Sequence, residues 1–344
     1  MNQLVLSTEE ITEIKALLSE VASRHNSAED PDLLSDACVY GHELPRRVRK
    51  FLNNFKTLES PPGICLLSGY TIDDNKIGST PTHWKSKPAI SPSLEEEILL
   101  VLFGSLLGDL LGWLTQQDGH IIHDVMPIKG HEHEQLGSSS EELLWWHTED
   151  AFHPYRCDYL GMMCLRNLDQ VETTMGYPDW SKLSPETIDI LFEPRFTIHP
   201  DESHLEKNKS DVTKRTGSQQ LMLESSYKKI NSMNKNPEKV AVLFGDRKSP
   251  YVRIDPYFMD PLKDDDDAQQ ALDLLIKNIE ANLFGKALQP GDFIFIDNYR
   301  VVHGRKPFKA RFDGFDRWLK RTNITRDLRK SRATRISNAS HVIA

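Results

Sequence analysis

The segment LWWHTED at residues 144–150 places an imidazole and a carboxylate two positions apart, and this spacing constrains the fold more than any other feature. On a β-strand, residues i and i+2 point to the same face, so His147 and Glu149 are expected to project side by side. A metal ion bound on one side needs a third protein ligand, and His303 is the best candidate. The fold must therefore bring two distant segments together around one metal ion.

The overall composition is that of an ordinary globular protein. The chain has 344 residues, 38% of them hydrophobic, and a formal net charge of -9. This acidic balance argues against a nucleic-acid partner, which would require a basic face. The four cysteines form no CxxC pair, and the N-terminal region lacks the features of a secretory signal. We therefore expect free thiols and a cytoplasmic location.

Residues 98–113 form the most apolar stretch of the chain. The stretch is shorter than the roughly 20 residues that cross a bilayer, and it contains Asp109. We expect a buried core helix here and no membrane partner.

Short apolar runs predict strands that bracket both candidate histidine ligands, and amphipathic runs predict flanking helices. The expected strands are residues 63–69, 159–165, 293–296 and 317–324, and the expected helices include 8–21 and 268–284, the latter closed by Gly285. No G-x-G-x-x-G follows a strand, which disfavours a Rossmann domain. The pattern predicts a mainly β, mixed α+β fold: a double-stranded β-helix (jelly roll) flanked by helices, in a single domain over 1–344.

A long polar, lysine-rich segment interrupts this pattern at about residues 200–238. Segments of this length without a strong periodic pattern are usually functional or mobile. We expect an insertion that acts as an active-site lid.

Two histidines and one carboxylate on one side of a metal ion are typical of non-haem Fe(II) oxygenases. Three coordination positions then stay open for a bidentate 2-oxo acid and dioxygen. The distal carboxylate of a 2-oxo acid needs a fixed cation, and Arg317 is the natural candidate. Two other classes remain open: a zinc hydrolase that uses the same three ligands, and a non-catalytic jelly-roll binding protein.

Three motifs resemble the clavaminate synthase-like 2-oxoglutarate oxygenases, and among them most closely the hydroxylases of free amino acids. The motifs are WHTEDAFHPYR at 146–156, DNYRVVHGR at 297–305 and DRWLKR at 316–321. The likeness extends over most of the chain, from residues 42–47 to 322–328.

The resemblance implies Fe(II) as the metal, with 2-oxoglutarate and O2 as cosubstrates, and it implies the following roles. His147, Glu149 and His303 would bind iron, Arg317 and Thr173 would bind 2-oxoglutarate, and Gln116, Arg321 and Glu149 would contact the substrate.

One departure from the family pattern bears on the substrate. Where an arginine-specific relative carries two acidic residues, this chain has Asp255-Pro256-Tyr257, with one carboxylate and one phenol. A guanidinium fork suits two acceptors, whereas one carboxylate can satisfy an ammonium. With Asp255 and Tyr257 as substrate contacts, we expect hydroxylation of C3 or C4 of a free basic amino acid, L-lysine being favoured and L-arginine the alternative.

Overall fold

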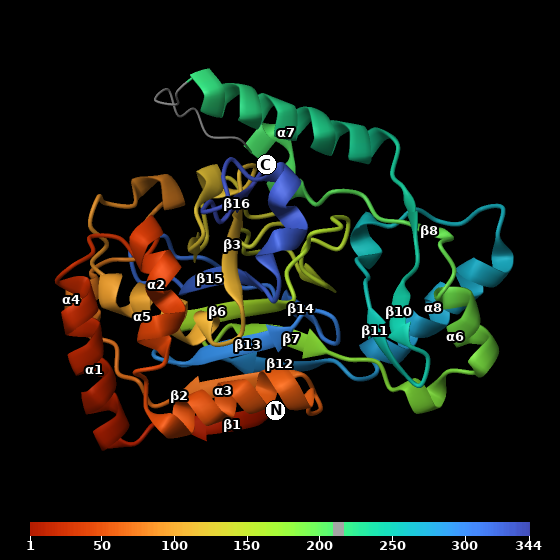
Figure 1. Cartoon of the computed structure of the whole chain (residues 1–344). Coiled ribbons are helices and arrows are strands. Elements are labelled where there is room, and N and C mark those ends of the chain that lie inside the picture. Colours follow the sequence, from red (N-terminus) through yellow and green to blue (C-terminus); the bar gives the residue numbers. More distant parts are fainter. Residues whose placement is uncertain (209–216) are drawn as a thin grey trace.

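The computed structural model describes residues 1–208 and 217–344. Two β-sheets lie face to face, and helices cover the outer face of the larger sheet (Figure 1). In spatial order, the larger sheet consists of β1 (Asn2–Val5), β2 (Ile64–Ser68), β13 (Phe293–Asp297), β6 (Tyr159–Arg166), β15 (Trp318–Thr325), β3 (Asp109–Trp113) and β16 (Val342–Ile343), with β4 (His123–Val125) also paired to β15.

The smaller sheet carries much of the candidate site. It consists of β12 (Phe284–Ala287), β7 (Glu172–Gly176), β14 (Val302–Arg305) and β5 (Leu144–His147), all antiparallel to their neighbours. These strands confirm the predicted mixed α+β fold, and two facing sheets are the arrangement that a double-stranded β-helix requires.

The core follows from the alternation of side chains along the central strands. In β2, Cys65 and Leu67 pack towards the helices, whereas Ile64 and Leu66 belong to the cluster between the two sheets. Because both faces of β2 are covered, its sequence is apolar throughout instead of alternating with polar residues.

The helices on the outer face are α1 (Thr8–Ala22), α2 (Pro31–Gly41), α3 (Arg46–Leu58) and α5 (Leu94–Ser105), with the short α4 (Asp74–Ile77) beside them. Helix α1 begins as predicted: the Ser7 side chain accepts a hydrogen bond from the Glu10 amide, and the Glu10 carboxylate accepts one from the Ser7 amide. No helix within the described ranges is long and apolar enough to cross a membrane.

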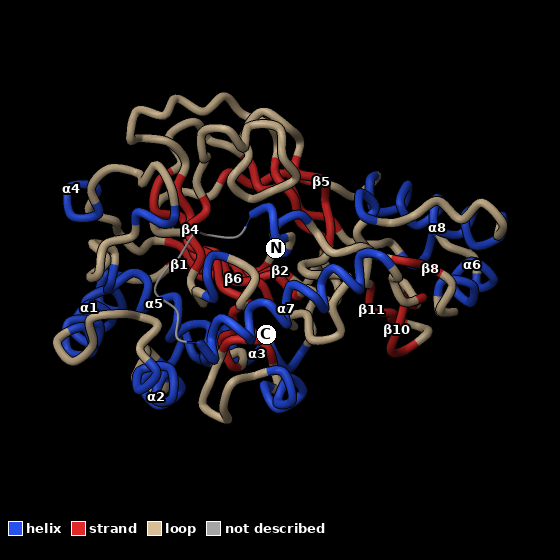
Figure 2. The backbone as a smooth tube through the Cα atoms, turned by 90° about the horizontal axis from the view of Figure 1, so that it is seen from above, coloured by secondary structure: helices blue, strands red, loops and turns tan. Residues whose placement is uncertain are grey.

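A large insertion lies between β7 and β12. It contains α6 (Pro185–Leu191), β8 (Phe196–Thr197), α7 (Gly217–Lys235), β9 (Lys239–Val240), β10 (Leu243–Asp246), β11 (Ser249–Val252) and α8 (Asp266–Glu280). Helix α7 crosses the top of the molecule in Figure 1 and lies in front of the sheets in Figure 2. The segment predicted as a lid, about 200–238, falls within this insertion, but its residues 209–216 lie outside the described part of the chain.

Two predicted helices were wrong in part. The stretch 98–113 changes from helix to strand, because α5 ends at Ser105 and β3 pairs with β15. Gly108 permits this change of direction, since a Cβ atom there would lie 2.2 Å from the Thr325 carbonyl oxygen. Gly285 does not close the helix that precedes it: α8 ends at Glu280, and Gly285 lies in β12.

Candidate active site

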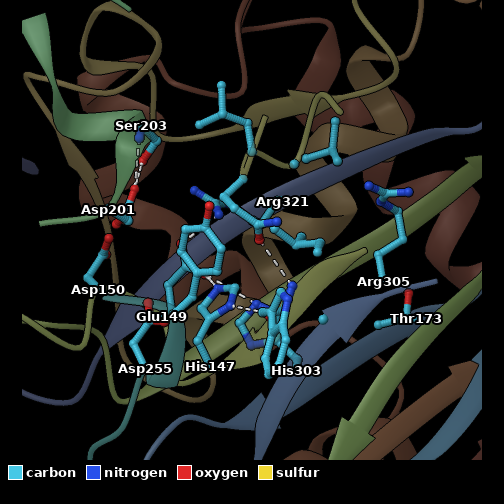
Figure 3. Close-up of a pocket in the computed structure, with 18 of the residues that line it drawn as sticks. His147, Glu149, Asp150, Thr173, Asp201, Ser203, Asp255, His303, Arg305 and Arg321 are labelled. Atoms are coloured by element: carbon cyan, nitrogen blue, oxygen red, sulfur yellow. Dashed lines mark hydrogen bonds and ion pairs between the residues drawn. The ribbon is translucent and has the colours of Figure 1, made fainter. Parts of the chain in front are cut away.

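His147, Glu149 and His303 meet between the two sheets (Figure 3). One potential ligand atom from each side chain lies within 4.8 Å of the other two. The register of the smaller sheet creates this proximity, since His303 on β14 is the direct cross-strand partner of His147 on β5. The expectation that one strand carries both His147 and Glu149 was wrong in detail, because β5 ends at His147 and Glu149 lies in the following turn.

The ring of His147 is oriented for metal binding. Its Nδ1 lies 2.7 Å from the Trp145 carbonyl oxygen, which can only accept, so Nδ1 carries the proton and Nε2 offers its lone pair. Oε2 of Glu149 lies 3.2 Å from Nε2 of His303 and 3.8 Å from Nε2 of His147. No hydrogen-bond donor among residues 1–208 and 217–344 reaches this buried Oε2. A buried carboxylate oxygen that faces two imidazole nitrogens fits a divalent metal ion.

Glu149 is fixed from both its backbone and its side chain. The Asn298 side chain accepts a hydrogen bond from the Glu149 amide at 2.6 Å and donates one to its carbonyl oxygen at 3.1 Å. The Arg321 guanidinium lies 2.5 Å from Oε1 of Glu149. Burial alone would raise the pKa of Glu149, but Arg321 and the two histidines hold it well below its usual range. The carboxylate is therefore ionised.

Arg317 and Thr173 lie together elsewhere in the same pocket. Arg317 is 5% exposed and donates a hydrogen bond from Nη2 to Oγ1 of Thr173 at 3.2 Å. Burial lowers the pKa of Arg317 to about 10. Within the described residues no carboxylate pairs with this guanidinium, so the pocket presents a buried cation suited to an anionic ligand.

Gln116 and Arg321, to which the resemblance assigns the substrate's α-amino and α-carboxylate groups, lie close together. Arg321 Nη2 lies 3.5 Å from Oε1 of Gln116. The Gln116 amide nitrogen donates to Oγ of Ser203 at 2.6 Å and lies 3.5 Å from Oδ1 of Asp150. Gln116 therefore links the catalytic pocket to the segment that precedes α7.

Besides Glu149 and Asp150, two further carboxylates line the pocket, those of Asp201 and Asp255 (Figure 3). Asp255 is 5% exposed, and burial raises its pKa to about 6. Asp201 comes from the insertion and acts electrostatically on Asp255, raising the pKa of Asp255 further. Tyr257 lines the same pocket but is 51% exposed. Sequence reasoning missed Asp201, and its only local signal was a capping pattern, in which its carboxylate accepts from the Ser203 amide.

The comparisons with known proteins agree with this geometry. The family described as "Taurine catabolism dioxygenase TauD, TfdA family" matches residues 100–323. Enduracididine beta-hydroxylase of Streptomyces hygroscopicus is 46% identical over 343 residues, and the match covers 100% of both chains. L-ornithine/L-arginine 3-hydroxylase of Catenulispora acidiphila is 45% identical over 350 residues, again with 100% of both chains covered. An L-lysine 3-hydroxylase of the same organism is 27% identical, over 97% of this chain and 87% of its own length.

A solved structure supports the same relationship. The crystal structure of the non-heme iron oxygenase OrfP in complex with Fe, succinate and (3S)-hydroxy-L-Arg matches with a TM-score of 0.94 and 44% identity, covering 100% of both chains. These findings confirm the resemblance inferred from the three motifs and give no support to a zinc hydrolase or a non-catalytic protein. The chain therefore belongs to the TauD/TfdA family and is an iron- and 2-oxoglutarate-dependent dioxygenase.

Proposed function

We propose that this enzyme hydroxylates C3 of a free guanidino amino acid, most simply L-arginine. In the balanced reaction, O2 supplies one oxygen atom to the C–H bond and the other to 2-oxoglutarate, which leaves as succinate and CO2. The observation that carries the choice of substrate is the presence of two carboxylates, Asp201 and Asp255, in the pocket that contains the candidate iron ligands.

In this proposal, His147, Glu149 and His303 bind Fe(II). The bound iron would supply the oxidising chemistry, with 2-oxoglutarate and O2 in its open positions. The protein binds and orients the reactants. The guanidinium of Arg317, assisted by Thr173, is suited to the distal carboxylate of 2-oxoglutarate because it is buried and has donors to spare.

The substrate's α-carboxylate and α-amine would bind at Arg321 and Gln116. Arg321 lines the catalytic pocket and already uses one nitrogen to orient Glu149. Its remaining N–H groups can bind a carboxylate, and Glu149 can contact the α-amine through the oxygen that does not bind metal. The amino-acid end is thereby tied to the metal site, and the side chain extends towards Asp255.

The proposed preference for a guanidinium departs from the sequence-based preference for lysine. That preference rested on a single carboxylate at Asp255, counted within one short stretch of sequence. Asp201 adds a second acceptor to the same pocket from a distant segment. Two carboxylates match the fork geometry of a guanidinium better than the point charge of an ammonium. The higher identity to the arginine and enduracididine hydroxylases than to the lysine hydroxylase supports the same choice.

We also propose that residues 1–344 form one catalytic domain and that the segment around 198–238 covers bound substrate. The segment leaves from β8 and returns at β9, and these two strands pair with each other. Ile230 of α7 packs against Ala151 and Phe152, directly after the metal motif. Bound L-arginine is then expected to slow proteolysis within 198–238, and unchanged cleavage would argue against a lid.

A substrate screen tests the proposed function. The enzyme is supplied with Fe(II), ascorbate, 2-oxoglutarate and O2, and succinate is measured with L-arginine, L-ornithine, L-lysine and L-asparagine. We expect the highest kcat/KM for L-arginine and, by NMR, a hydroxyl group on C3. A higher kcat/KM for lysine or ornithine would reject guanidinium recognition, and turnover that does not depend on 2-oxoglutarate would reject the reaction itself.

A further inference from the structure

His123 contacts Arg321, the active-site arginine that also contacts Glu149. It lies on β4, and its direct cross-strand partner on β15 is Arg321. Cross-strand partners project on the same face of a sheet, and here Nη2 of Arg321 lies 2.9 Å from Nδ1 of His123. The His123 side chain is buried, with 5% of the residue exposed.

The hydrogen bonds of His123 define its tautomer. Nε2 lies 2.9 Å from the carbonyl oxygen of His120, which can only accept, so Nε2 carries the proton. Nδ1 is then an acceptor for the guanidinium of Arg321. Burial, together with the positive charge of Arg321, lowers the pKa of His123 well below its usual range. His123 is thus a neutral acceptor held in one orientation.

Arg321 has few other fixed contacts. Its Nη1 lies 2.5 Å from Oε1 of Glu149, and the Gln116 oxygen lies at the long distance of 3.5 Å from Nη2. Its buried Nε has no hydrogen-bond partner in the part of the chain that the structure describes. One contact at Glu149 leaves a planar guanidinium free to rotate about that contact. The second contact, at His123, fixes the plane and therefore the direction of the remaining N–H groups.

We propose that His123 is a positioning residue for substrate: it fixes the plane of the Arg321 guanidinium, which also contacts Glu149, so that the remaining N–H groups point at the amino acid's carboxylate. This inference rests on the proposed function, in which Arg321 binds that carboxylate. A neutral acceptor suits the role, because a carboxylate at position 123 would neutralise Arg321 and compete with the substrate. The ordered path runs from the His120 carbonyl through His123 and Arg321 to Glu149.

The test compares variants that keep or remove the acceptor. In His123→Asn the amide oxygen occupies roughly the place of Nδ1, whereas His123→Phe keeps a ring without an acceptor. His131→Phe is the matched control. His123 and His131 both line a second pocket beside the active site, but the His131 ring contacts Oγ of Ser138 and not Arg321. The measurements are KM and kcat for L-arginine, the ratio of succinate to hydroxylated product, and the Kd values of Mn(II) and L-arginine by calorimetry.

We expect His123→Phe to raise the KM and Kd for L-arginine by about ten- to a hundredfold, the effect of losing a hydrogen bond to a charged group. Succinate should exceed product, while Mn(II) binding stays within about twofold of wild type. His123→Asn and His131→Phe should behave like wild type. In an Arg321→Lys background, His123→Phe should add little, because it acts through the arginine.

Equal KM and equal coupling of succinate to product in His123→Phe and wild type would overturn the proposal. Equal impairment of His123→Asn and His123→Phe would do the same, since an acceptor would then be irrelevant. If His123→Phe does not fold, His123→Ser, which is too short to reach Arg321, replaces it in the comparison. Failure of the wild-type enzyme to hydroxylate any guanidino amino acid would instead refute the proposed function.

Discussion

Replacing Arg317 by methionine is expected to stabilise the enzyme without cosubstrate and to abolish tight binding of 2-oxoglutarate. Arg317 is 5% exposed, and its one hydrogen bond within the described residues goes to Thr173. A buried guanidinium with a single neutral acceptor destabilises the fold until an anion pairs with it. Methionine fills similar space without a charge.

The size of the effect follows from the pKa of Arg317. Burial lowers this pKa from 12.5 to about 10, and at about 1.4 kcal/mol per pH unit the buried site disfavours the charged form by roughly 3 kcal/mol. Loss of the donor to Thr173 offsets part of this, so we expect a net gain of about 1–2 kcal/mol in the free energy of unfolding, or a few degrees in Tm. Loss of the buried partner of a carboxylate weakens binding by about 2–5 kcal/mol, which is at least about thirtyfold in Kd.

Arg305→Met is the matched control, because Arg305 is also a buried arginine of this pocket but has many partners. Its guanidinium donates to the carbonyl oxygens of Ser140, Glu142 and Lys306 and to Oγ of Ser139. Its removal leaves buried acceptors without donors, so the Tm should fall.

Thermal unfolding with and without 2-oxoglutarate, in the presence of Mn(II), measures both effects, and calorimetry gives the Kd for 2-oxoglutarate. A fall in the Tm of Arg317→Met comparable to that of Arg305→Met would refute the assignment of Arg317 as an unpaired buried cation. A Kd for 2-oxoglutarate equal to that of wild type would refute its role in cosubstrate binding.

Three further changes test specificity, metal binding and pH dependence. Asp201→Asn should raise the KM for L-arginine about tenfold or more, while the exposed Asp264→Asn should not. Gly304→Ala should weaken Mn(II) binding, measured by calorimetry, because its Cβ would lie 2.5 Å from a carbonyl oxygen of β5. Gly217→Ala should bind Mn(II) normally, because its Cβ would meet no atom of the described residues within 4 Å. Burial raises the pKa of Asp297 from 3.8 to about 7, so stability falls as pH rises through this window. In Asp297→Asn the free energy of unfolding should fall less between pH 4 and 8, by up to about 4 kcal/mol, as measured by chemical unfolding. An unchanged pH dependence of the unfolding free energy would contradict the raised pKa of Asp297.

The cluster of candidate metal ligands was predictable from sequence because two of its three members are neighbours in the chain. His147 and Glu149 are two residues apart, and His303 follows the β-branched pair Val301-Val302 at the start of the buried strand β14. The capping residues of α1 were predictable for the same reason, since Ser7 and Glu10 interact within one turn. In these cases the pattern that predicts the element also contains the residues that interact.

Other elements were not predictable because the deciding contact lies far away in the chain. The apolar run 98–113 has no period that separates helix from strand, and the strand half is decided by pairing with β15. Gly285 follows a helical pattern, but it lies on β12 opposite Thr174 of β7. Glycine there accommodates the Glu172 side chain, since a Cβ would lie 2.2 Å from its Oε2.

The residues that are proposed to select the substrate are the least local of all, and this explains why the sequence favoured lysine whereas the proposal from the folded pocket favours a guanidinium. Asp255 follows β11, Asp201 belongs to the insertion before α7, and His123 reaches Arg321 only through the register of β4 on β15. None of these relationships has a sequence spacing that a pattern could detect. The candidate metal site depends on the pairing of β5 with β14 and on the turn after β5, whereas the proposed choice of substrate depends on where the insertion and β4 place their side chains. The carboxylates that decide between a guanidinium and an ammonium must therefore be counted in the folded pocket. Substitutions in the insertion are expected to change which amino acid is bound without disturbing His147, Glu149 or His303.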